Sequence, residues 1–153
     1  MNLNSHVKII LIETTSPANI GSTLRAMKTM SFGDLILVNP KNFPDKEVST
    51  LAANAKDLIN KIKVVKNLDE ALDGIDFVVA TSSRQRKVPW PCEDLHIASP
   101  KIVKFAEEKS IGLLFGREDR GLTNEELQQS NLHIQLPANE NYSVLNLAMS
   151  VQV

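Results

Sequence analysis

The stretch IGLLFGREDRGLTNEELQQSNLHIQLPANENYSVLNLAMSVQV, residues 111–153, decides how the rest of the chain is interpreted. Its pattern predicts a buried strand, a polar loop between two glycines, a short helix, a second strand, another polar loop and a final helix. In open α/β sheets, ligands bind at the carboxyl ends of the strands, where such loops meet. We therefore expect these two loops to form a ligand site.

The residues before this stretch repeat the same alternation of strands and helices. Near-continuous apolar runs such as VKIILI (residues 7–12) and DLILV (residues 34–38) are typical of strands buried on both faces of a parallel sheet. The whole chain, residues 1–153, is therefore predicted to be a single α/β domain with a mainly parallel sheet and helices on both faces. Further strands are expected at residues 63–65, 77–80, 111–115 and 133–136.

Helix boundaries are predicted from capping residues and from breaks in the apolar periodicity. The first helix is expected to begin near Ala18 or Asn19, with Gly33 as its C-terminal cap. A capping box of Thr123 and Glu126 opens the fifth helix. The other helices are expected at residues 47–60, at residues 68–72, from Ser99 to about residue 109, and from Val144 onward.

The composition excludes several classes of protein. The sequence is 42% hydrophobic and 23% charged with a net charge of −1, so it lacks an overall basic excess but is compatible with a local basic patch. The single Cys92 excludes an intrachain disulfide framework and supplies no metal-ligand pattern, and no metal site is expected. Because we find neither a signal peptide nor an apolar run of about 18 residues, we expect a cytoplasmic protein with no membrane association.

Familiar nucleotide and hydrolase motifs are absent. The sequence contains no G-x-G-x-x-G after the first strand, no phosphate-binding P-loop and no G-x-S-x-G. The first strand ends at Glu13 without a carboxylate pair, which weakens the alternative of a flavodoxin-like regulator. His6, His96 and His133 lack partners in sequence and are interpreted as structural or exposed. The polar residues at the strand-to-loop junctions are the remaining candidates for function.

The first junction places Asn19, Gly21, Ser22 and Arg25 near the start of the first helix. Asn19 suits a helix cap, and Gly21 allows another backbone to approach closely. Arg25 follows one turn later on the polar face, where a guanidinium can bind phosphate. A solvated helix face with a capping asparagine is the alternative interpretation.

The second junction follows the strand expected at residues 77–80. Thr81 and Ser82 supply small hydroxyl groups that suit a ligand loop. Arg84 and Arg86 suit phosphate, and Trp90 suits stacking on a base. An exposed loop that carries a charge cluster is the alternative interpretation.

The last two junctions lie in the stretch quoted first. Gly116 and Gly121 permit backbone conformations closed to other residues, so the amides between them suit a ligand such as adenine. A plain strand–turn–helix connection is the alternative. Ser143 lies close to the exposed amides that begin the last helix. Asn146, expected one turn inside that helix, needs a polar partner and is predicted to brace a neighbouring loop.

Taken in order, these motifs resemble the SPOUT superfamily of RNA methyltransferases, and in particular its TrmJ-type tRNA 2′-O-methyltransferase branch. The resemblance implies a C-terminal trefoil knot, which general fold rules would not suggest. It also implies S-adenosylmethionine as cofactor, a homodimer and tRNA as substrate. The motifs are NIGSTLRAMKTM (19–30), VNP (38–40), TSSR (81–84), PWP (89–91), FGREDRGLTNEEL (115–127) and PANENYSVLNLA (137–148), and they extend over nearly the whole chain.

The reaction implied by the resemblance is methylation of a ribose 2′-hydroxyl, at the cytidine or uridine in position 32 of the anticodon loop. Other tRNA or ribosomal RNA sites, and a cofactor-binding RNA module with little catalysis of its own, are the alternatives. Arg25 is the implied catalytic residue, with Asn19 beside it. Cofactor contacts are expected from Thr81, Ser82, Gly116, Arg117, Glu118, Leu136, Ser143 and Leu145, and RNA contacts from Ser22, Lys28, Arg84 and Arg86.

The sequence departs from the family pattern in its last motif. The family usually has Ser-Leu-Asn where this chain has Val144-Leu145-Asn146, so a hydroxyl expected near the reacting centre is missing or moved to Ser143. Family members usually also carry a C-terminal helical extension that helps to bind tRNA. Because residues 144–153 contain no helix stop signal, the natural protein is expected to continue beyond Val153.

Overall fold

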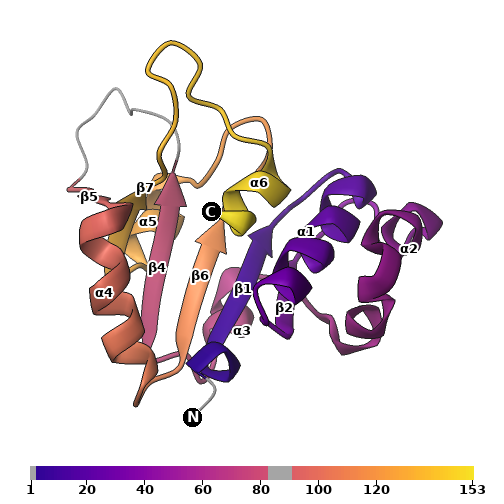
Figure 1. Cartoon of the computed structure of the whole chain (residues 1–153), viewed down its shortest axis with the longest axis horizontal. Helices are drawn as coiled ribbons and strands as arrows, with labels where there is room; N and C mark the ends of the chain where they lie inside the picture. Colours follow the sequence, from indigo (N-terminus) through magenta and orange to yellow (C-terminus); the bar gives the residue numbers. More distant parts are fainter. Residues whose placement is uncertain (1–2, 83–90) are drawn as a thin grey trace.

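The structure is a computed structural model that describes residues 3–82 and 91–153 (Figure 1). Its centre is a seven-stranded sheet with the order β3-β2-β1-β6-β4-β7-β5. Every neighbouring pair of strands is parallel, which confirms the predicted sheet. The strands are β1 (Val7–Ile12), β2 (Asp34–Val38), β3 (Lys63–Val65), β4 (Phe77–Ser82), β5 (Glu93–Asp94), β6 (Ile111–Phe115) and β7 (Leu132–Gln135).

Helices cover both faces of the sheet, as predicted (Figure 1). One face packs against α1 (Pro17–Thr29), α2 (Lys46–Ala52), α4 (Leu95–Ala106) and α6 (Leu147–Gln152). The other face packs against α3 (Leu68–Leu72) and α5 (Asn124–Gln128). Two 3₁₀ helices, η1 (Leu3–His6) and η2 (Ala53–Lys61), complete the described elements. No helix in this described part of the chain has the length and apolarity needed to cross a membrane.

Strand β1 is buried on both of its faces because helices lie on both sides of it. Ile9 and Leu11 pack in the cluster that contains α1, whereas Ile10 and Ile12 pack in the cluster that contains α3 and α5. All four side chains are at most 1% exposed. Each contributes roughly 1.5–3 kcal/mol relative to an exposed position, so an apolar residue is required at every position in this part of the strand.

The predicted start of the first helix is wrong by one or two residues. Ser16 is the N-cap, since its hydroxyl oxygen accepts a hydrogen bond from the backbone N–H of Asn19 at 3.3 Å. Pro17 is the first helical residue, a position where its missing N–H costs nothing. After the helix, Ser31 rather than Gly33 adopts the left-handed conformation, with φ 64°.

Three other helix predictions need correction. Helix α4 begins at Leu95 rather than at Ser99, because the Asp94 carboxylate accepts from the N–H of His96 at 2.8 Å and Pro100 lies inside the helix. The helix predicted at residues 47–60 is divided at Ala53, whose φ of 48° ends α2. Helix α6 begins at Leu147 rather than at Val144, and Asn146 is its N-cap.

The strand order places the carboxyl ends of four strands together. From β1 the chain first adds β2 and β3 on one side and later adds β4 on the other, and β6 is inserted between β1 and β4. Because the strands are parallel, the junctions that follow β1, β4, β6 and β7 meet at the upper edge of the sheet in Figure 1. This is the switch point at which open α/β sheets bind ligands.

The close packing of α1 against α2 can be tested by substitution at Gly21. A Cβ at this position would lie 2.5 Å from the Val48 carbonyl oxygen and 2.8 Å from the Leu51 Cβ. Gly21→Ala is therefore expected to destabilise the protein by about 1–3 kcal/mol, although alanine normally favours a helix. Urea unfolding measures the change. Gly33→Ala is the matched control because nothing lies within 4 Å of its added Cβ, and equal midpoints for the two variants would contradict the close approach.

Candidate active site at the carboxyl edge of the sheet

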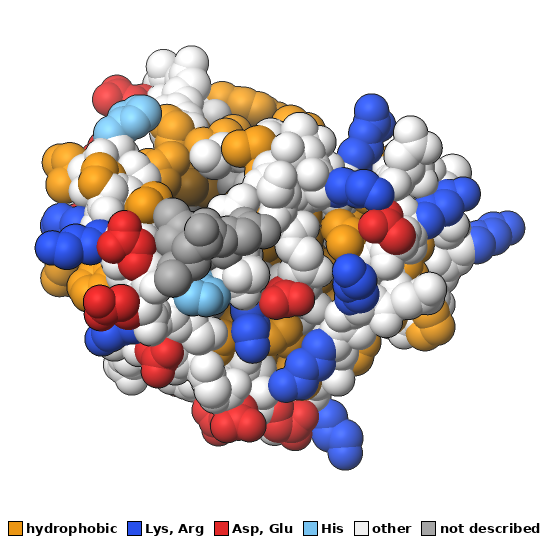
Figure 2. All heavy atoms as spheres, turned by 60° about the horizontal axis from the view of Figure 1, so that its bottom comes forward, with side chains coloured by type: hydrophobic (Ala, Val, Ile, Leu, Met, Phe, Trp, Pro, Cys, Tyr) orange, Lys and Arg blue, Asp and Glu red, His pale blue; other side chains and the backbone are white. Residues whose placement is uncertain are grey.

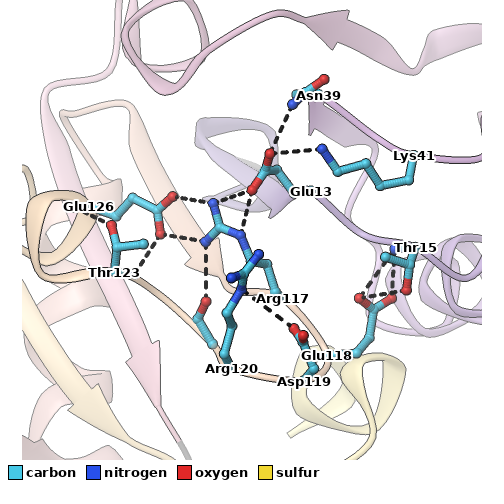
Figure 3. A network of polar contacts seen from close by, with 11 residues as sticks. Glu13, Thr15, Asn39, Lys41, Arg117, Glu118, Asp119, Arg120, Thr123 and Glu126 are labelled. Carbon is cyan, nitrogen blue, oxygen red and sulfur yellow. Dashed lines mark hydrogen bonds and ion pairs between the residues drawn. The ribbon is translucent and has the colours of Figure 1, made fainter.

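The Glu118 carboxylate, which lies in the turn after β6, contacts the start of α1 (Figure 3). It accepts hydrogen bonds from the backbone N–H of Thr15 at 3.2 Å and of Ser16 at 3.4 Å, and from the Thr14 hydroxyl. Backbone N–H groups at the start of a helix have no partner within the helix and carry partial positive charge. A carboxylate 102 residues after Ser16 therefore accepts hydrogen bonds from the backbone that leads into α1.

The surroundings of Glu118 keep its carboxyl group ionised. Burial alone would raise the pKa of Glu118, but hydrogen bonds from Thr14, Asn19 and Thr15 outweigh burial and lower the pKa below its usual value. An ionised carboxylate with a lowered pKa accepts hydrogen bonds well but is a poor general base at neutral pH. The geometry therefore assigns Glu118 to holding its neighbours in place.

Asn19 is oriented from both sides. Its Nδ2 donates to the Glu118 carboxylate at 3.2 Å, and its Oδ1 accepts from the Asn146 Nδ2 at 3.0 Å. The Asn146 Oδ1 in turn accepts from the backbone N–H of Ala148 at 2.9 Å, which fixes the orientation of the Asn146 amide. The prediction that Asn146 needs a polar partner is confirmed, but the partner is Asn19 on α1 and not the predicted neighbouring loop. This hydrogen-bonded chain, Glu118–Asn19–Asn146, joins three of the predicted junctions.

Arg117 points to the opposite side of the same turn and binds two carboxylates (Figure 3). Its guanidinium donates to Glu126 at 2.9 and 3.0 Å and forms an ion pair with Glu13. Glu13 also accepts from the Lys41 ammonium and from the Asn39 amide, each at 2.9 Å. Hydrogen bonds from Lys41 and Arg117 lower the pKa of Glu13 to about 2. The Arg117 side chain, predicted to contact the cofactor, is thus already bound within the protein.

Two glycines shape the turn that carries both residues. The backbone N–H and carbonyl of Arg117 pair with the carbonyl and N–H of Gly121, at 3.2 and 2.9 Å. A Cβ on Gly116 would overlap the backbone of Gly121, and Gly121 itself has φ 70°. The predicted backbone conformation is confirmed at Gly121, which is left-handed, whereas Gly116 is required for a different reason, the close approach of the Gly121 backbone.

The other predicted cofactor residues lie at the same edge of the sheet. The Thr81 hydroxyl is buried and donates to the Leu114 carbonyl at 2.8 Å, so its role within the chain is structural. The Leu136 N–H donates to the Ser82 carbonyl at 2.8 Å and holds the ends of β4 and β7 together. Leu145 packs against the apolar cluster that contains Leu136, and Ser143 is half-buried beside it in sequence.

The predicted RNA residues differ in how accessible they are. Arg25 is exposed, and no partner for its guanidinium is found among the residues the structure describes. It lies six residues after Asn19, roughly 9 Å further along the helix axis. Lys28 is committed to the neighbouring elements, because its ammonium binds Asp57 at 2.5 Å and the Asn54 carbonyl at 2.9 Å. Ser22 is half-buried on α1, and Arg84 and Arg86 lie outside the described residues.

Comparison with known proteins identifies the family. The model of the SpoU rRNA methylase family matches residues 6–153. The chain belongs to this family. A relative from Sodalis glossinidius, named tRNA (cytidine/uridine-2′-O-)-methyltransferase TrmJ, is 49% identical over 148 residues, which are 97% of this chain and 58% of the relative. This SpoU-family chain therefore spans less than two thirds of the length of that relative.

Solved structures of similar proteins share the fold. A probable methylase family protein from Haemophilus influenzae Rd KW20 has a TM-score of 0.90 and 42% identity, covering 97% of this chain and 63% of that one. TrmJ from Z. mobilis ZM4 has a TM-score of 0.86 and 32% identity, covering 95% of this chain and 65% of that one. The α/β architecture described above is therefore that of other SpoU-type methylases.

Sequence reasoning missed the two carboxylates around Arg117. Glu13 has no second carboxylate near it in sequence, and the pattern around Glu126 indicates only a capping box. A usable signal was present: an arginine between two glycines, with acidic residues at the end of the first strand and in the first turn of the following helix. This signal can be interpreted only when β1 and β6 are known to be neighbours in the sheet, and the local pattern does not contain that information.

The pKa of Glu13 predicts how stability depends on pH. Folding lowers this pKa from 4.5 to about 2, so the carboxylate stabilises the fold fully above pH 4.5, and its contribution is lost as the pH falls toward 2. We expect the free energy of unfolding, measured with urea, to decrease between pH 5 and pH 3. Glu13→Gln should be less stable at pH 7 and should decrease less steeply. Identical slopes for the wild type and Glu13→Gln would contradict this assignment.

Proposed function

We propose that this chain carries S-adenosylmethionine-dependent 2′-O-methyltransferase activity toward tRNA, the activity for which its 49%-identical relative is named. The observation that carries the proposal is the hydrogen-bonded chain Glu118–Asn19–Asn146. It brings together one side chain from each of three motifs at the switch point of a SpoU-family sheet. Polar side chains that meet at this ligand-binding edge of an open α/β sheet are an arrangement that a functional site requires.

The residues at this edge fit the proposed cofactor. Among the described residues, no hydrogen bond is found to the backbone N–H groups of residues 143–145, which leaves donors available for an adenine or a carboxylate. Leu136 and Leu145 place apolar surface next to these groups. An adenosine group needs this combination of flat apolar contact and a few fixed polar partners. We therefore assign the cofactor to the loops after β4, β6 and β7.

We propose that the C-terminal segment forms the trefoil knot that is expected from the family resemblance. Strand β7 lies beyond β4 in the sheet, yet α6, which follows β7 in the chain, packs against α1 and β6 (Figure 1). Residues 136–146 must therefore run back across the carboxyl end of β4. In the proposed knot this segment passes through the loop formed by the preceding motifs, so that both walls of the cofactor site come from one entangled stretch.

The charge distribution supports an RNA substrate. Residues 46–66 contain five lysines, all exposed, and two acidic residues, although the whole chain has a net charge of −1. Figure 2 shows Lys and Arg side chains gathered toward the side of the molecule formed by α2 and η2. Local positive charge of this kind binds phosphates without a basic overall composition. We assign the target to the cytidine or uridine at position 32 of the anticodon loop, as the family resemblance implies.

We propose that Arg25 stabilises negative charge on the substrate and does not act as a general base. When bound between the loops after β4, β6 and β7, S-adenosylmethionine would supply an electrophilic methyl group to the ribose 2′-oxygen, whose proton would pass to water. Deprotonating an arginine at neutral pH would cost roughly 7 kcal/mol. A charged, exposed Arg25 instead holds the neighbouring phosphate and stabilises the developing negative charge on the ribose oxygen.

Arg25→Lys tests this role, because lysine keeps the charge but loses the planar fork. We expect methyl transfer to total tRNA to fall by about 100-fold, equivalent to about 2.7 kcal/mol, with unchanged calorimetric binding of S-adenosylmethionine. Arg120→Lys, the same change at an arginine with a 72% exposed side chain, is the control. Nearly full turnover of Arg25→Lys would exclude the forked contact. Cofactor binding without transfer by the wild type would favour a non-catalytic RNA module.

We also propose a homodimer that uses the surface around α6. Tyr142, Val144, Met149 and Val153 are between 45% and 81% exposed, which is unusual for four apolar or aromatic side chains so close in sequence. Light scattering should give twice the chain mass for the wild type and the chain mass for Met149→Glu. Val103→Glu on α4, at a side chain of similar exposure, should remain dimeric. A monomeric wild type at micromolar concentration would contradict the proposal.

A further inference from the structure

We infer that Arg117 is a positioning residue: its ion pairs with Glu13 and Glu126 hold the turn of residues 116–122 in the shape that binds the cofactor. This inference rests on the proposed function and goes beyond it, because it gives the Arg117 side chain no contact with cofactor or RNA. The family resemblance implied such a contact. The geometry points instead to an internal hydrogen-bonded network around the guanidinium (Figure 3).

The guanidinium of Arg117 is fully used inside the protein. Its Nε donates to Glu13, and its two terminal nitrogens donate to the two carboxylate oxygens of Glu126 at 2.9 and 3.0 Å. One of these nitrogens also donates to the Gly121 carbonyl at 3.3 Å, the same carbonyl that accepts from the Arg117 backbone. The side chain therefore ties the two ends of its own turn together while it binds both carboxylates.

Burial and charge make this network strong. The side chains of Arg117, Glu126 and Glu13 are 11%, 13% and 22% exposed, and Lys41 supplies the second positive charge. Hydrogen bonds to Glu126 and Glu13 raise the pKa of Arg117 above its usual value. Removing one charge from a largely buried set leaves the remaining charges unbalanced, so the effect of a single substitution is large. Only arginine has a planar fork that can bind one carboxylate with two nitrogens and a second carboxylate with Nε.

The two carboxylates connect the turn to different parts of the fold. Glu126 belongs to α5 and also accepts from the Thr123 N–H at 2.8 Å, as part of the capping box. Glu13 follows β1 and is bound by Asn39 and Lys41, which follow β2. Arg117 thus fixes the turn after β6 to the end of β1, through Glu13 to the residues that follow β2, and to the start of α5.

Glu118, the next residue, holds the same turn from the other side through the start of α1. Consecutive side chains therefore bind opposite sides of one turn, and Gly116 is pressed against Gly121 between them. A turn held on both sides presents its backbone to a ligand in one conformation. Such preorganisation improves affinity, because binding then does not have to order the loop.

Two substitutions separate this role from an ordinary stabilising ion pair. Glu126→Gln keeps an amide oxygen that suits the capping box but removes the negative charge that faces Arg117. Arg117→Lys keeps the charge but loses the fork. Glu125→Gln is the matched control, since it makes the same change as Glu126→Gln at the adjacent position of α5, where the side chain is exposed and lies outside the turn. The full chain is used for every measurement.

The readouts are the calorimetric dissociation constant for S-adenosylmethionine and the urea unfolding midpoint without cofactor. We expect both Glu126→Gln and Arg117→Lys to weaken cofactor binding at least about tenfold at a temperature where each is folded, and Glu125→Gln to remain within about twofold of the wild type. Using two variants keeps the test decisive if one of them does not fold.

Binding within twofold of the wild type for a folded Glu126→Gln or Arg117→Lys would overturn the inference, even if the unfolding midpoint falls, because the network would then only stabilise the fold. Equal weakening in Glu125→Gln would also overturn it, since loss of any negative charge near the turn would suffice. Absence of cofactor binding by the wild type would instead refute the proposed function and, with it, this inference. The two failures are therefore distinguished by the wild-type measurement alone.

Discussion

The hydrogen bonds between the Glu118 carboxylate and the start of α1 are the interaction on which the site depends. A parallel sheet sends every strand-to-helix connection to the same edge, and each helix that starts there presents N–H groups without partners. At α1 those groups belong to Thr15 and Ser16, and the acceptor comes from the turn after β6. The first helix is thereby fixed relative to the turn proposed to bind the cofactor. The Arg25 guanidinium has no partner among the described residues, so the position of Arg25 is set by that attachment of α1.

The strands could be predicted from the sequence because burial on both faces leaves a strong local signal. A run such as residues 7–12 has to be apolar at every position when helices cover both faces of the sheet. Helix ends were predicted less well, since several residues offer alternative caps. Ser99 and Pro100 have the chemistry of a helix start, yet the helix begins at Leu95, where the Asp94 carboxylate caps it first. Local preference alone does not decide between two adequate caps.

The last helix shows a different source of error. Val144 and Leu145 continue the apolar pattern of α6, so the sequence predicts a helix that includes them. Leu145 is apolar because it packs against the cluster that contains Leu136, outside any helix. Asn146 then caps the helix, which begins at Leu147, and its amide binds Asn19. The prediction that Asn146 needs a partner is confirmed although the predicted start of α6 is wrong, because that prediction followed from the chemistry of the amide and not from its place in a helix.

The site could be predicted as a set of junctions but not as a set of contacts. Parallel strands necessarily bring their carboxyl ends to one edge, so the two loops of residues 111–153 were expected to form one ligand site. Which acidic residue Arg117 binds depends on the insertion of β6 beside β1, which brings Glu13 within reach. No local sequence pattern encodes that insertion. The resemblance to a known family supplied the roles of whole motifs, but it could not separate a side chain that binds the ligand from one that holds the ligand-binding turn.

The surroundings of Val144 indicate which contacts its departure from the family pattern affects. The Val144 side chain is 45% exposed. Helices α1 and α6 are connected through Asn146, whose amide caps α6 and binds Asn19. Replacing a family serine at position 144 therefore leaves the Glu118–Asn19–Asn146 chain intact. If a hydroxyl is needed near the reacting ribose, the half-buried Ser143 is the adjacent residue that has one. The departure from the family pattern thus bears on the contact with substrate, whereas the architecture that holds Arg25 and the cofactor loops does not depend on it.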